Sequence, residues 1–68
     1  MKPLDALNEL LENQIMVKLK NGTEIQGKLK AFDIHINLVL ENAELKESDL
    51  TKKFPKLFVR GDMILFVA

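Results

Sequence analysis

The feature that most limits the fold is a run of alternating residues on both sides of an Asn-Gly dipeptide. Ile15, Val17 and Leu19 alternate with a methionine and two lysines before Asn21-Gly22, and the alternation resumes after it. A period of two places every second side chain on the same face of a β-strand. Asn-Gly suits a type I′ hairpin turn, because both central residues of that turn need positive φ. The sequence therefore predicts an antiparallel pair of strands with one buried face.

The second strand of this pair extends from Thr23 to about Phe32 and has a glycine in its middle. Gly27 weakens the packing of a strand, so its expected use is a sharp bend of the kind that small barrels require. The alternation predicts two faces for this strand. Ile25, Leu29 and Ala31 lie on one face, and Gln26, Lys28 and Lys30 lie on the other.

The N-terminal segment has the periodicity of a helix. Four leucines recur at helical spacing between residues 4 and 11, with polar residues on the opposite side. Pro3 suits the first turn of a helix, and Asn13 suits its end. We therefore expect a short amphipathic helix over about residues 4–12.

Three further strands are expected in the second half of the chain. The third covers about residues 38–45, and the polar run from Glu47 to Lys53 predicts an exposed hairpin loop. The fourth strand covers residues 54–59 and the fifth covers residues 63–67, with Arg60-Gly61-Asp62 between them. A helix followed by five short strands is typical of an all-β domain built as a small, strongly bent barrel.

The last two strands are apolar on both faces, from Leu57 to Val59 and from Met63 to Val67. Strands of this kind are usually covered on both sides. One domain of 68 residues has too little material to do so, and its core is marginal because it buries only about 60% of the unfolded surface. The absence of cysteine excludes disulfides and thiolate zinc sites, and one histidine with scattered carboxylates makes no metal site. We expect no cofactor, and oligomerisation remains as the source of stability.

The charge and hydropathy of the chain exclude two broad classes of protein. Ten basic and ten acidic residues give a net charge of zero, whereas domains that grip nucleic acid by neutralising phosphates are usually strongly basic. A nucleic-acid ligand would therefore have to be selected by a specific pocket. No segment approaches the roughly 18 apolar residues of a membrane span, and acidic residues interrupt the N-terminal apolar pattern. We expect a soluble, cytoplasmic protein with no membrane contact.

Arginine and histidine each occur once, and both fall between predicted strands. Arg60 stands among nine lysines as the only basic side chain that is planar, able to stack on a ring and able to present a fork of donors. His35 lies in the segment from Asp33 to Asn37, where polar residues alternate with isoleucines and so share one side. An imidazole and a guanidinium offer two flat faces for a base, and an amide can read a base edge. The sequence thus predicts a base-binding pocket.

The neighbouring residues support this predicted pocket. Asn37 is expected to donate to one uracil carbonyl and to accept from the ring N–H. Asp33 and Asp62 are expected to act as acceptors that orient Asn37 and Arg60. Gly61 lets the backbone turn tightly and approach a ligand.

Each of these residues also has a simpler explanation. His35 alone is more often an exposed loop residue without a ligand. Arg60 and Asp62 could form a turn ion pair worth under about 1 kcal/mol, and Asn37 could cap a turn. The Arg60-Gly61-Asp62 tripeptide also occurs as a cell-adhesion signal, but chance better explains its presence in this sequence. Only the combination of residues favours a nucleic-acid site.

Two segments resemble the two sequence motifs of the Sm-like (Lsm) protein family. The resemblance to the first motif covers residues 17–29, VKLKNGTEIQGKL, and continues over residues 32–40, FDIHINLVL. The resemblance to the second motif covers residues 58–67, FVRGDMILFV. Pro3-Leu4-Asp5 and the leucines after it look like the N-terminal helix of archaeal members. The resemblance covers nearly all of a single domain, residues 1–68, with a helix at about 4–12, the first motif at about 15–45 and the second at about 54–67.

The resemblance implies a helix capping a bent, five-stranded SH3-like barrel, the Sm fold. It also implies homo-oligomeric rings, usually heptamers, in which the fourth strand of one subunit pairs with the fifth strand of the next. In the family, the histidine and arginine sandwich a uracil on the inner rim and the asparagine reads its edge. Those roles fall on His35, Arg60 and Asn37, with Gly61 and Asp62 completing the second loop.

The expected function is that of a ring-forming, non-enzymatic protein. It would bind short single-stranded, uridine-rich RNA in RNA processing or ribonucleoprotein assembly, with other ribonucleoprotein proteins as possible partners. The alternative is a structural or protein-interaction ring whose pocket is unused. An enzyme is disfavoured because the sequence has no nucleophile–base pair, phosphate-cradling glycine loop or metal set. Phe32 and Lys2 stand where relatives often have tyrosine and arginine, so the resemblance is weaker at a second RNA surface near the helix.

Overall fold

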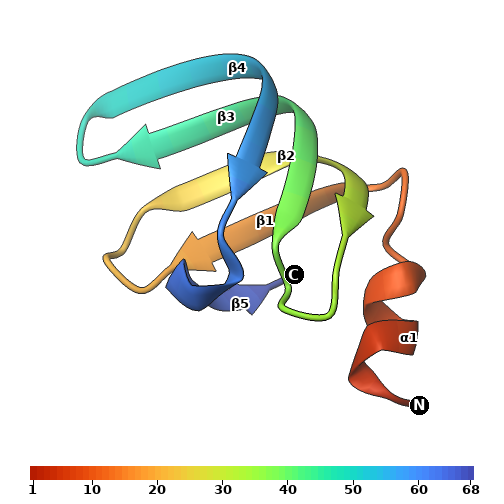
Figure 1. Cartoon of the computed structure of the whole chain (residues 1–68). Helices are drawn as coiled ribbons and strands as arrows, with labels where there is room; N and C mark the ends of the chain where they lie inside the picture. Colours follow the sequence, from red (N-terminus) through yellow and green to blue (C-terminus); the bar gives the residue numbers. More distant parts are fainter.

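The chain forms one strongly curved antiparallel sheet with a short helix at its N-terminal end (Figure 1). The computed structural model describes residues 1–68, and none of its helices is long and apolar enough to span a membrane. The strands lie in the order β4-β3-β2-β1-β5. The elements are α1 Pro3–Asn8, β1 Gln14–Leu19, β2 Glu24–Phe32, β3 Leu38–Glu47, β4 Leu50–Val59, the 3-10 helix η1 Gly61–Met63 and β5 Ile64–Val67. The predicted fold class, mainly β with an N-terminal helix and five strands, is confirmed.

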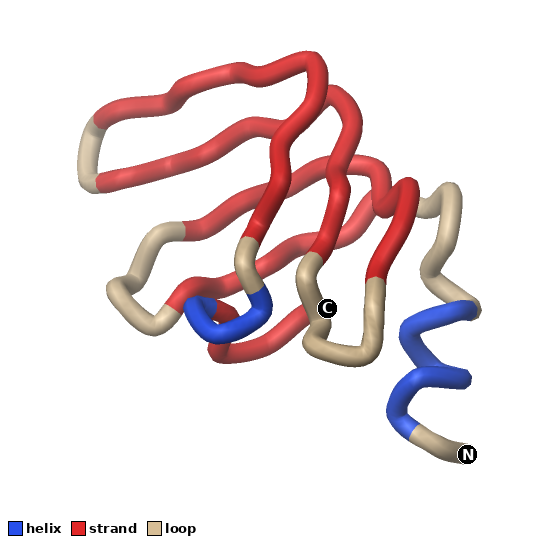
Figure 2. Tube along the Cα trace, in the orientation of Figure 1, coloured by secondary structure: helices blue, strands red, loops and turns tan.

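The predicted bend in β2 coincides with Gly27. The pairing between β2 and β3 shifts register between Gln26 and Lys28, on either side of this glycine. A Cβ at Gly27 would lie 3.2 Å from the Leu40 Cβ and 3.3 Å from the Ala43 Cα. The missing side chain therefore lets β3 pack closely against β2, and both strands curve strongly (Figure 2).

The core follows the predicted alternation in the first hairpin. Ile15 and Val17 are buried in β1, and Ile25 and Leu29 are buried in β2. Leu7 is the only buried residue of α1, so it is the anchor of the helix. Burying a side chain of this size stabilises a fold by about 1.5–3 kcal/mol. The complete core comprises Leu7, Ile15, Val17, Ile25, Leu29, Leu38, Leu40, Ala43 and Val59.

The helix is shorter than the predicted residues 4–12. It ends at Asn8, and tight turns follow in which the Leu11 N–H donates to the Asn8 carbonyl at 3.2 Å. Glu12 then takes a positive φ of 68°, and its N–H donates to the Leu29 carbonyl at 2.7 Å. The backbone of the last predicted turn is thus used to attach the chain to β2. Leu10 and Leu11 still pack against the core, which explains the helical spacing of the leucines.

The Asn-Gly turn is not the predicted type I′ turn. Gly22 has a positive φ of 91°, but Asn21 does not have a positive φ. The Gly22 N–H donates to the Leu19 carbonyl at 3.0 Å, and the Asn21 side-chain oxygen accepts the Thr23 N–H at 3.0 Å. This side-chain bond is an Asx turn, and it closes a three-residue loop with the glycine in last place.

Two residues leave their predicted places near strand ends. Ala31 is exposed rather than on the face of Leu29, because the pairing with β3 shifts register between these two residues. Such a bulge interrupts the alternation of side chains. Met63 belongs to η1, so β5 begins at Ile64.

The segment from Glu47 to Lys53, predicted to be a loop, is mostly strand. β3 runs to Glu47 and β4 begins at Leu50, which leaves a two-residue turn. Glu44 lies opposite Lys53 with the charged atoms 3.6 Å apart, as suits neighbouring strands. The segment is polar because this hairpin projects beyond the core and its residues are exposed, not because it lacks strand pairing.

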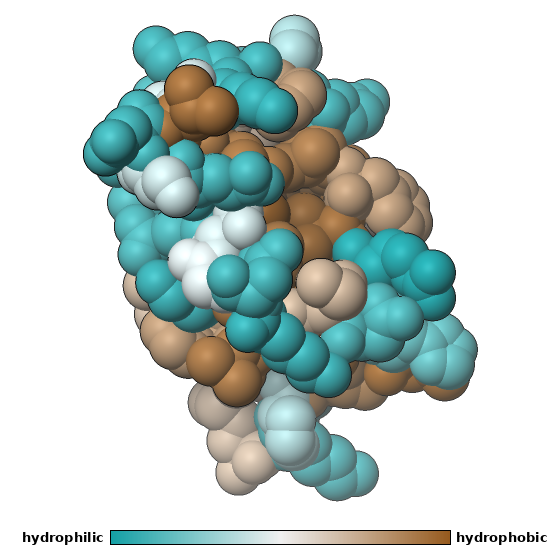
Figure 3. Space-filling view, turned by 90° about the vertical axis from the view of Figure 1, so that its left-hand side faces the viewer, coloured by the Kyte–Doolittle hydropathy of each residue, from teal (hydrophilic) through white to brown (hydrophobic).

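β4 and β5 are the two edges of the sheet, and both carry exposed apolar side chains. Phe58 on β4 is 67% exposed, and Leu65 and Phe66 on β5 are 63% and 46% exposed. Figure 3 shows apolar patches among polar surface on the side that carries the hairpin tips and η1. Because unpaired apolar edges favour association, these strands agree with the expectation that another subunit covers part of the surface.

We predict that the protein runs as a discrete closed oligomer at micromolar concentration, because closure leaves no free edge. Leu65→Asp should dissociate this oligomer into folded subunits. The Leu65 side chain is exposed within one subunit, so the change should not disturb the core, but an aspartate there would bury a charge at the contact between subunits. Multi-angle light scattering measures both states.

Leu50→Asp is the matched control for this experiment. Leu50 is also 63% exposed, but it lies on the projecting hairpin beyond Pro55, which has no N–H to offer a neighbouring strand. This variant should keep the parent's mass. A parent protein that stays a folded monomer at micromolar concentration would contradict the prediction.

Candidate functional site

Two loops meet at one end of the sheet because of the way in which β3 pairs with β4. Leu38, the first residue of β3, lies opposite Val59, the last residue of β4. The β2–β3 loop, residues 33–37, therefore lies beside the segment that follows β4 (Figure 1). Together they form an open pocket of about 480 Å³. Its lining residues are His35, Asn37, Arg60, Gly61 and Asp62.

The structure thus brings together all five residues that the sequence places in a base-binding pocket. Asp33, the sixth candidate, does not line the pocket but is hydrogen-bonded to Asn37 behind it. The fold gives the positions of these residues, whereas their roles toward a ligand remain a prediction.

Asp33 organises the β2–β3 loop. One of its carboxylate oxygens accepts the N–H of His35 at 2.9 Å and the N–H of Asn37 at 3.1 Å, and the other accepts the Asn37 side-chain N–H at 3.0 Å. The bond from the Asn37 side chain, helped by the two backbone bonds, holds the pKa of the Asp33 carboxyl below its ordinary value of 3.8. The loop is tight enough to hold Ile36 at a φ of 62°, an unfavourable conformation for a β-branched residue.

Asn37 connects the two loops. Its side-chain nitrogen donates to Asp33 within its own loop, and its side-chain oxygen accepts the Gly61 N–H at 2.8 Å across the gap. The Gly61 N–H is half-buried, so losing its acceptor would cost about 1–3 kcal/mol. Reasoning from the sequence considered Asn37 only as a base reader or as a turn cap, so this link between the two loops was not predicted.

Gly61 is required by the space between the loops. A Cβ added there would overlap the His35 carbonyl oxygen and lie 2.8 Å from the Ile36 carbonyl carbon. The φ of Gly61 is not positive, so conformational freedom is not the reason for glycine. The sequence suggested a close approach to a ligand, whereas the close approach in this structure is to the other loop.

The two flat side chains that line the pocket, those of His35 and Arg60, are exposed. The Arg60 side chain is 76% exposed, and its guanidinium lies 3.0 Å from the Asp62 carboxylate. An ion pair this exposed contributes under about 1 kcal/mol to stability, so its main effect is to restrict where the guanidinium points. His35 is exposed on the other loop. Both flat groups are therefore accessible to a flat ligand.

The charges of this site do not suit an anion. Arg60 is the only lysine or arginine in the lining, and Asp62 and the nearby Asp33 outnumber it. No group of three or more His, Cys, Asp or Glu side chains in the structure is placed to hold a metal ion. The site offers two flat surfaces and one amide, which suits the uncharged ring of a base.

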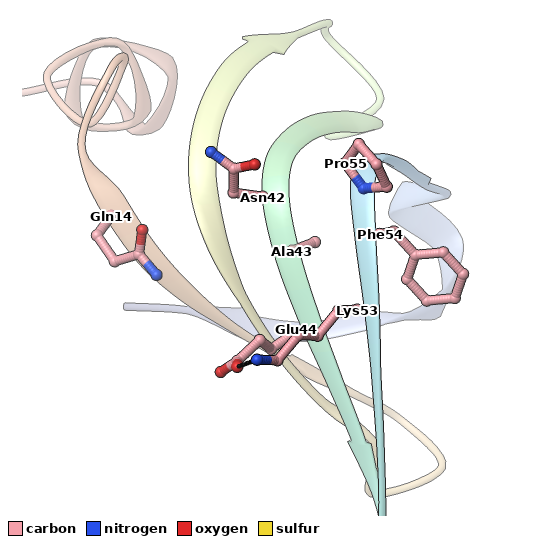
Figure 4. Close-up of a pocket in the computed structure, with 7 residues that line it drawn as sticks. All are labelled: Gln14, Asn42, Ala43, Glu44, Lys53, Phe54 and Pro55. Carbon is pink, nitrogen blue, oxygen red and sulfur yellow. Dashed lines mark ion pairs between the residues drawn. The ribbon is translucent and has the colours of Figure 1, made fainter.

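A second open pocket, of about 510 Å³, was not predicted from the sequence (Figure 4). It is lined by Gln14, Asn42, Ala43, Glu44, Lys53, Phe54 and Pro55. Lys53 is paired with Glu44, and the only aromatic ring, that of Phe54, points away from the two amides. This pocket has no pair of flat side chains between which a ligand could lie, so it is a weaker candidate than the pocket around His35.

The chain is similar to known proteins over nearly all of its length. The model of the LSM domain family matches residues 5–68. An snRNP Sm-like protein of Methanosarcina barkeri is 46% identical over 98% of this chain and 94% of its own length. The structure of the Pyrococcus abyssii Sm protein in complex with a uridine heptamer is similar with a TM-score of 0.93 and 36% identity, over 100% of this chain and 97% of that one. A heptameric archaeal Sm protein is similar with a TM-score of 0.86 and 38% identity, over 94% of each chain.

The lowered pKa of Asp33 generates a prediction about acid. A carboxylate whose pKa is lowered in the folded state stabilises the fold above its ordinary pKa of 3.8, and that contribution is lost as the pH falls through the lowered value. Asp33→Asn should therefore be less stable than the parent at neutral pH, and the difference should shrink as the pH falls below about 4. Urea unfolding at a fixed protein concentration measures it, and a difference that stayed constant with pH would contradict this account of Asp33.

Proposed function

The chain belongs to the LSM domain family, and from this membership we propose that it forms a ring that binds short single-stranded, uridine-rich RNA at its inner rim. The observation that carries the proposal is the pocket that brings together His35 and Asn37 from the β2–β3 loop with Arg60 from the segment that follows β4. The Pyrococcus abyssii protein, whose fold is closely similar, is known in complex with a uridine heptamer, which supports the same ligand class here.

The ring is proposed to be a heptamer of identical subunits. Each subunit offers two free edges, β4 and β5, with exposed apolar side chains on both. Pairing β4 of one subunit with β5 of the next satisfies both edges by a single repeated contact, and such head-to-tail contacts form a ring where the rotation between subunits closes. The heptameric archaeal Sm protein with a similar fold supports seven as the number.

The residues of the pocket have distinct roles in this proposal. His35 and Arg60 stack on the two faces of a uracil, which contributes about 1–3 kcal/mol for each base. Asn37 reads the edge of the base with the N–H and the lone pair that its bonds to Asp33 and Gly61 leave free. Asp62 holds the guanidinium of Arg60 over the pocket.

We further propose that the ring acts on RNA without chemistry of its own, in the cytoplasm. It would take part in RNA processing or ribonucleoprotein assembly, alone or with other ribonucleoprotein proteins. The description of the Methanosarcina relative as an snRNP Sm-like protein supports this assignment. The competing function, a structural ring with an idle pocket, is separated from it by the experiment on Arg60.

Arg60→Lys keeps the charge and removes the planar face. It should weaken the binding of oligo-uridine by at least about tenfold, because stacking is lost in every subunit, while the mass of the ring stays unchanged. Fluorescence anisotropy gives the affinity and light scattering gives the mass. Lys46→Arg, the reverse exchange on the projecting hairpin, is the control and should bind like the parent.

Each other outcome of this experiment has a meaning. Parent-like binding by Arg60→Lys would show that charge alone suffices and that the stacking model is wrong. Collapse of the ring would assign Arg60 a structural role. A parent protein that forms rings but binds no oligo-uridine would favour the structural ring.

The charge balance predicts a shallow dependence on salt. A protein that makes 6–10 phosphate contacts loses about 10³–10⁵ in affinity between 50 and 200 mM salt. With a net charge of zero and a pocket suited to an uncharged ring, this protein should lose less than about 10³ over the same range. Titrations of oligo-uridine at three or four salt concentrations test this, and a loss as steep as that of a basic protein would show that phosphate neutralisation dominates.

A further inference from the structure

We propose that Pro55 is a register stop: it ends the part of the β4 edge with which β5 of a second copy of this chain can pair, and so gives the contact between subunits one geometry. The inference rests on the proposed ring and deepens it, because it names the residue that decides how far two subunits overlap. Beyond Pro55 the edge of the sheet continues, but it is closed to that partner.

Pro55 divides the β4 edge into two parts of different character. Residues 50–54 lie on the projecting hairpin and include two exposed lysines. Residues 56–59, on the other side of Pro55, carry the exposed ring of Phe58. The strand proposed to pair with them, β5, is itself four residues long, Ile64–Val67. The part of β4 that follows Pro55 therefore has the same length as its partner.

β3 and β4 both bend at the level of Pro55. The pairs on either side place Pro55 opposite Asn42, which has a positive φ of 53°. The pairing of β2 with β3 shifts register at the same level, and Figure 4 shows Pro55 on the bend of β4. A short strand laid along residues 56–59 would therefore have to bend in order to follow the edge past Pro55.

Pro55 also lacks the group that a neighbouring strand needs. It has no N–H to donate, and its ring fills the space beside the backbone nitrogen. Proline in a sheet is found mainly on edge strands and at bulges for this reason, and β4 is an edge strand. A second strand paired along β4 could not continue its ladder of hydrogen bonds across this residue.

The contact between β4 and β5 specifies its own register poorly. Met16 in β1 and Ala68 exchange two backbone hydrogen bonds of 2.8 Å. Because the N–H and C=O groups of successive residues in such a ladder point to opposite sides, Phe66 also faces β1, whereas Leu65 and Val67 face the free edge. β5 thus offers a partner the backbone groups of only these two residues. So few bonds can form at more than one position along a strand.

A shift of two residues toward the hairpin is the competing register. Side chains return to the same face every two residues, so this shift keeps each β5 side chain on its own side of the sheet. It would also bring β5 against Phe54, a half-buried ring that does not pack on the core. Pro55 lies inside the segment that this register would use, residues 54–57. It therefore blocks the alternative without weakening the contact along residues 56–59.

Pro55→Ala returns the N–H and removes the ring, so it should open the second register. Native mass spectrometry should give one closed oligomer for the parent. The same measurement should give a mixture of masses for Pro55→Ala, because a different overlap changes the rotation between subunits, and contacts whose rotation does not close form open chains. Pro3→Ala, the same exchange in the first turn of α1, is the control and should keep the single mass.

The double variant Pro55→Ala/Phe54→Lys separates register from folding. The lysine removes the apolar contact that favours the second register and adds a charge to the edge, so the single mass should return. A purely structural role for Pro55 predicts no such return, because Phe54 lies outside the core. A double variant that still gives a mixture of masses would overturn the stop.

The remaining outcomes are also decisive. A parent that stays monomeric overturns the proposed ring and the stop with it. A parent that forms one ring, with Pro55→Ala giving the same single mass, overturns the stop alone. Should the variants fail to fold, a crystal structure of the parent ring shows the register directly. A neighbouring β5 paired with residues 56–59 alone supports the stop, and a ladder that continues to Phe54 overturns it.

Discussion

The fold depends on one close approach between strands, at Gly27. Because this residue has no side chain, β3 can pack against β2 with Leu40 and Ala43 in contact range, and a small sheet can curve enough to enclose a core of nine residues. The antiparallel pairing of β3 with β4 then determines which loops lie next to each other. Once Leu38 lies opposite Val59, the loops at those strand ends are neighbours, and the pocket is assembled from residues far apart in the sequence.

The small size of the chain explains why the edges of the sheet are apolar. A chain of this size cannot cover both faces of its last two strands, and Phe58, Leu65 and Phe66 remain exposed in a single subunit. An exposed apolar edge is a hazard in a monomer and a useful contact in a ring. The projecting β3–β4 hairpin shows the contrast, because its exposed strands carry charged pairs such as Glu44 and Lys53 and are protected against pairing.

Much of this could be predicted from the sequence because periodicity, composition and motif order each report on one structural property. Alternation identified the strands of the first hairpin, and the single arginine and histidine identified the pocket. The errors have local causes. Asn21 makes a side-chain bond to the Thr23 N–H that competes with the expected turn, and a bulge exposes Ala31. The link from Asn37 to Gly61 could not be predicted, because it joins residues 24 positions apart and exists only after the sheet has bent.

Ligand binding depends on assembly, because a single pocket would bind RNA only weakly. Stacking worth about 1–3 kcal/mol per base is less than the roughly 4 kcal/mol that corresponds to a millimolar dissociation constant. Because the carboxylates of Asp62 and Asp33 outnumber the guanidinium of Arg60, attraction of phosphate adds little at the pocket itself. A free subunit would therefore hardly retain RNA. Once subunits are joined, a strand bound in one pocket meets the next at high effective concentration, and the contacts accumulate without any new chemistry. In the proposed ring, the apolar edges of β4 and β5 would thus be as necessary for RNA binding as the stacking of His35 and Arg60.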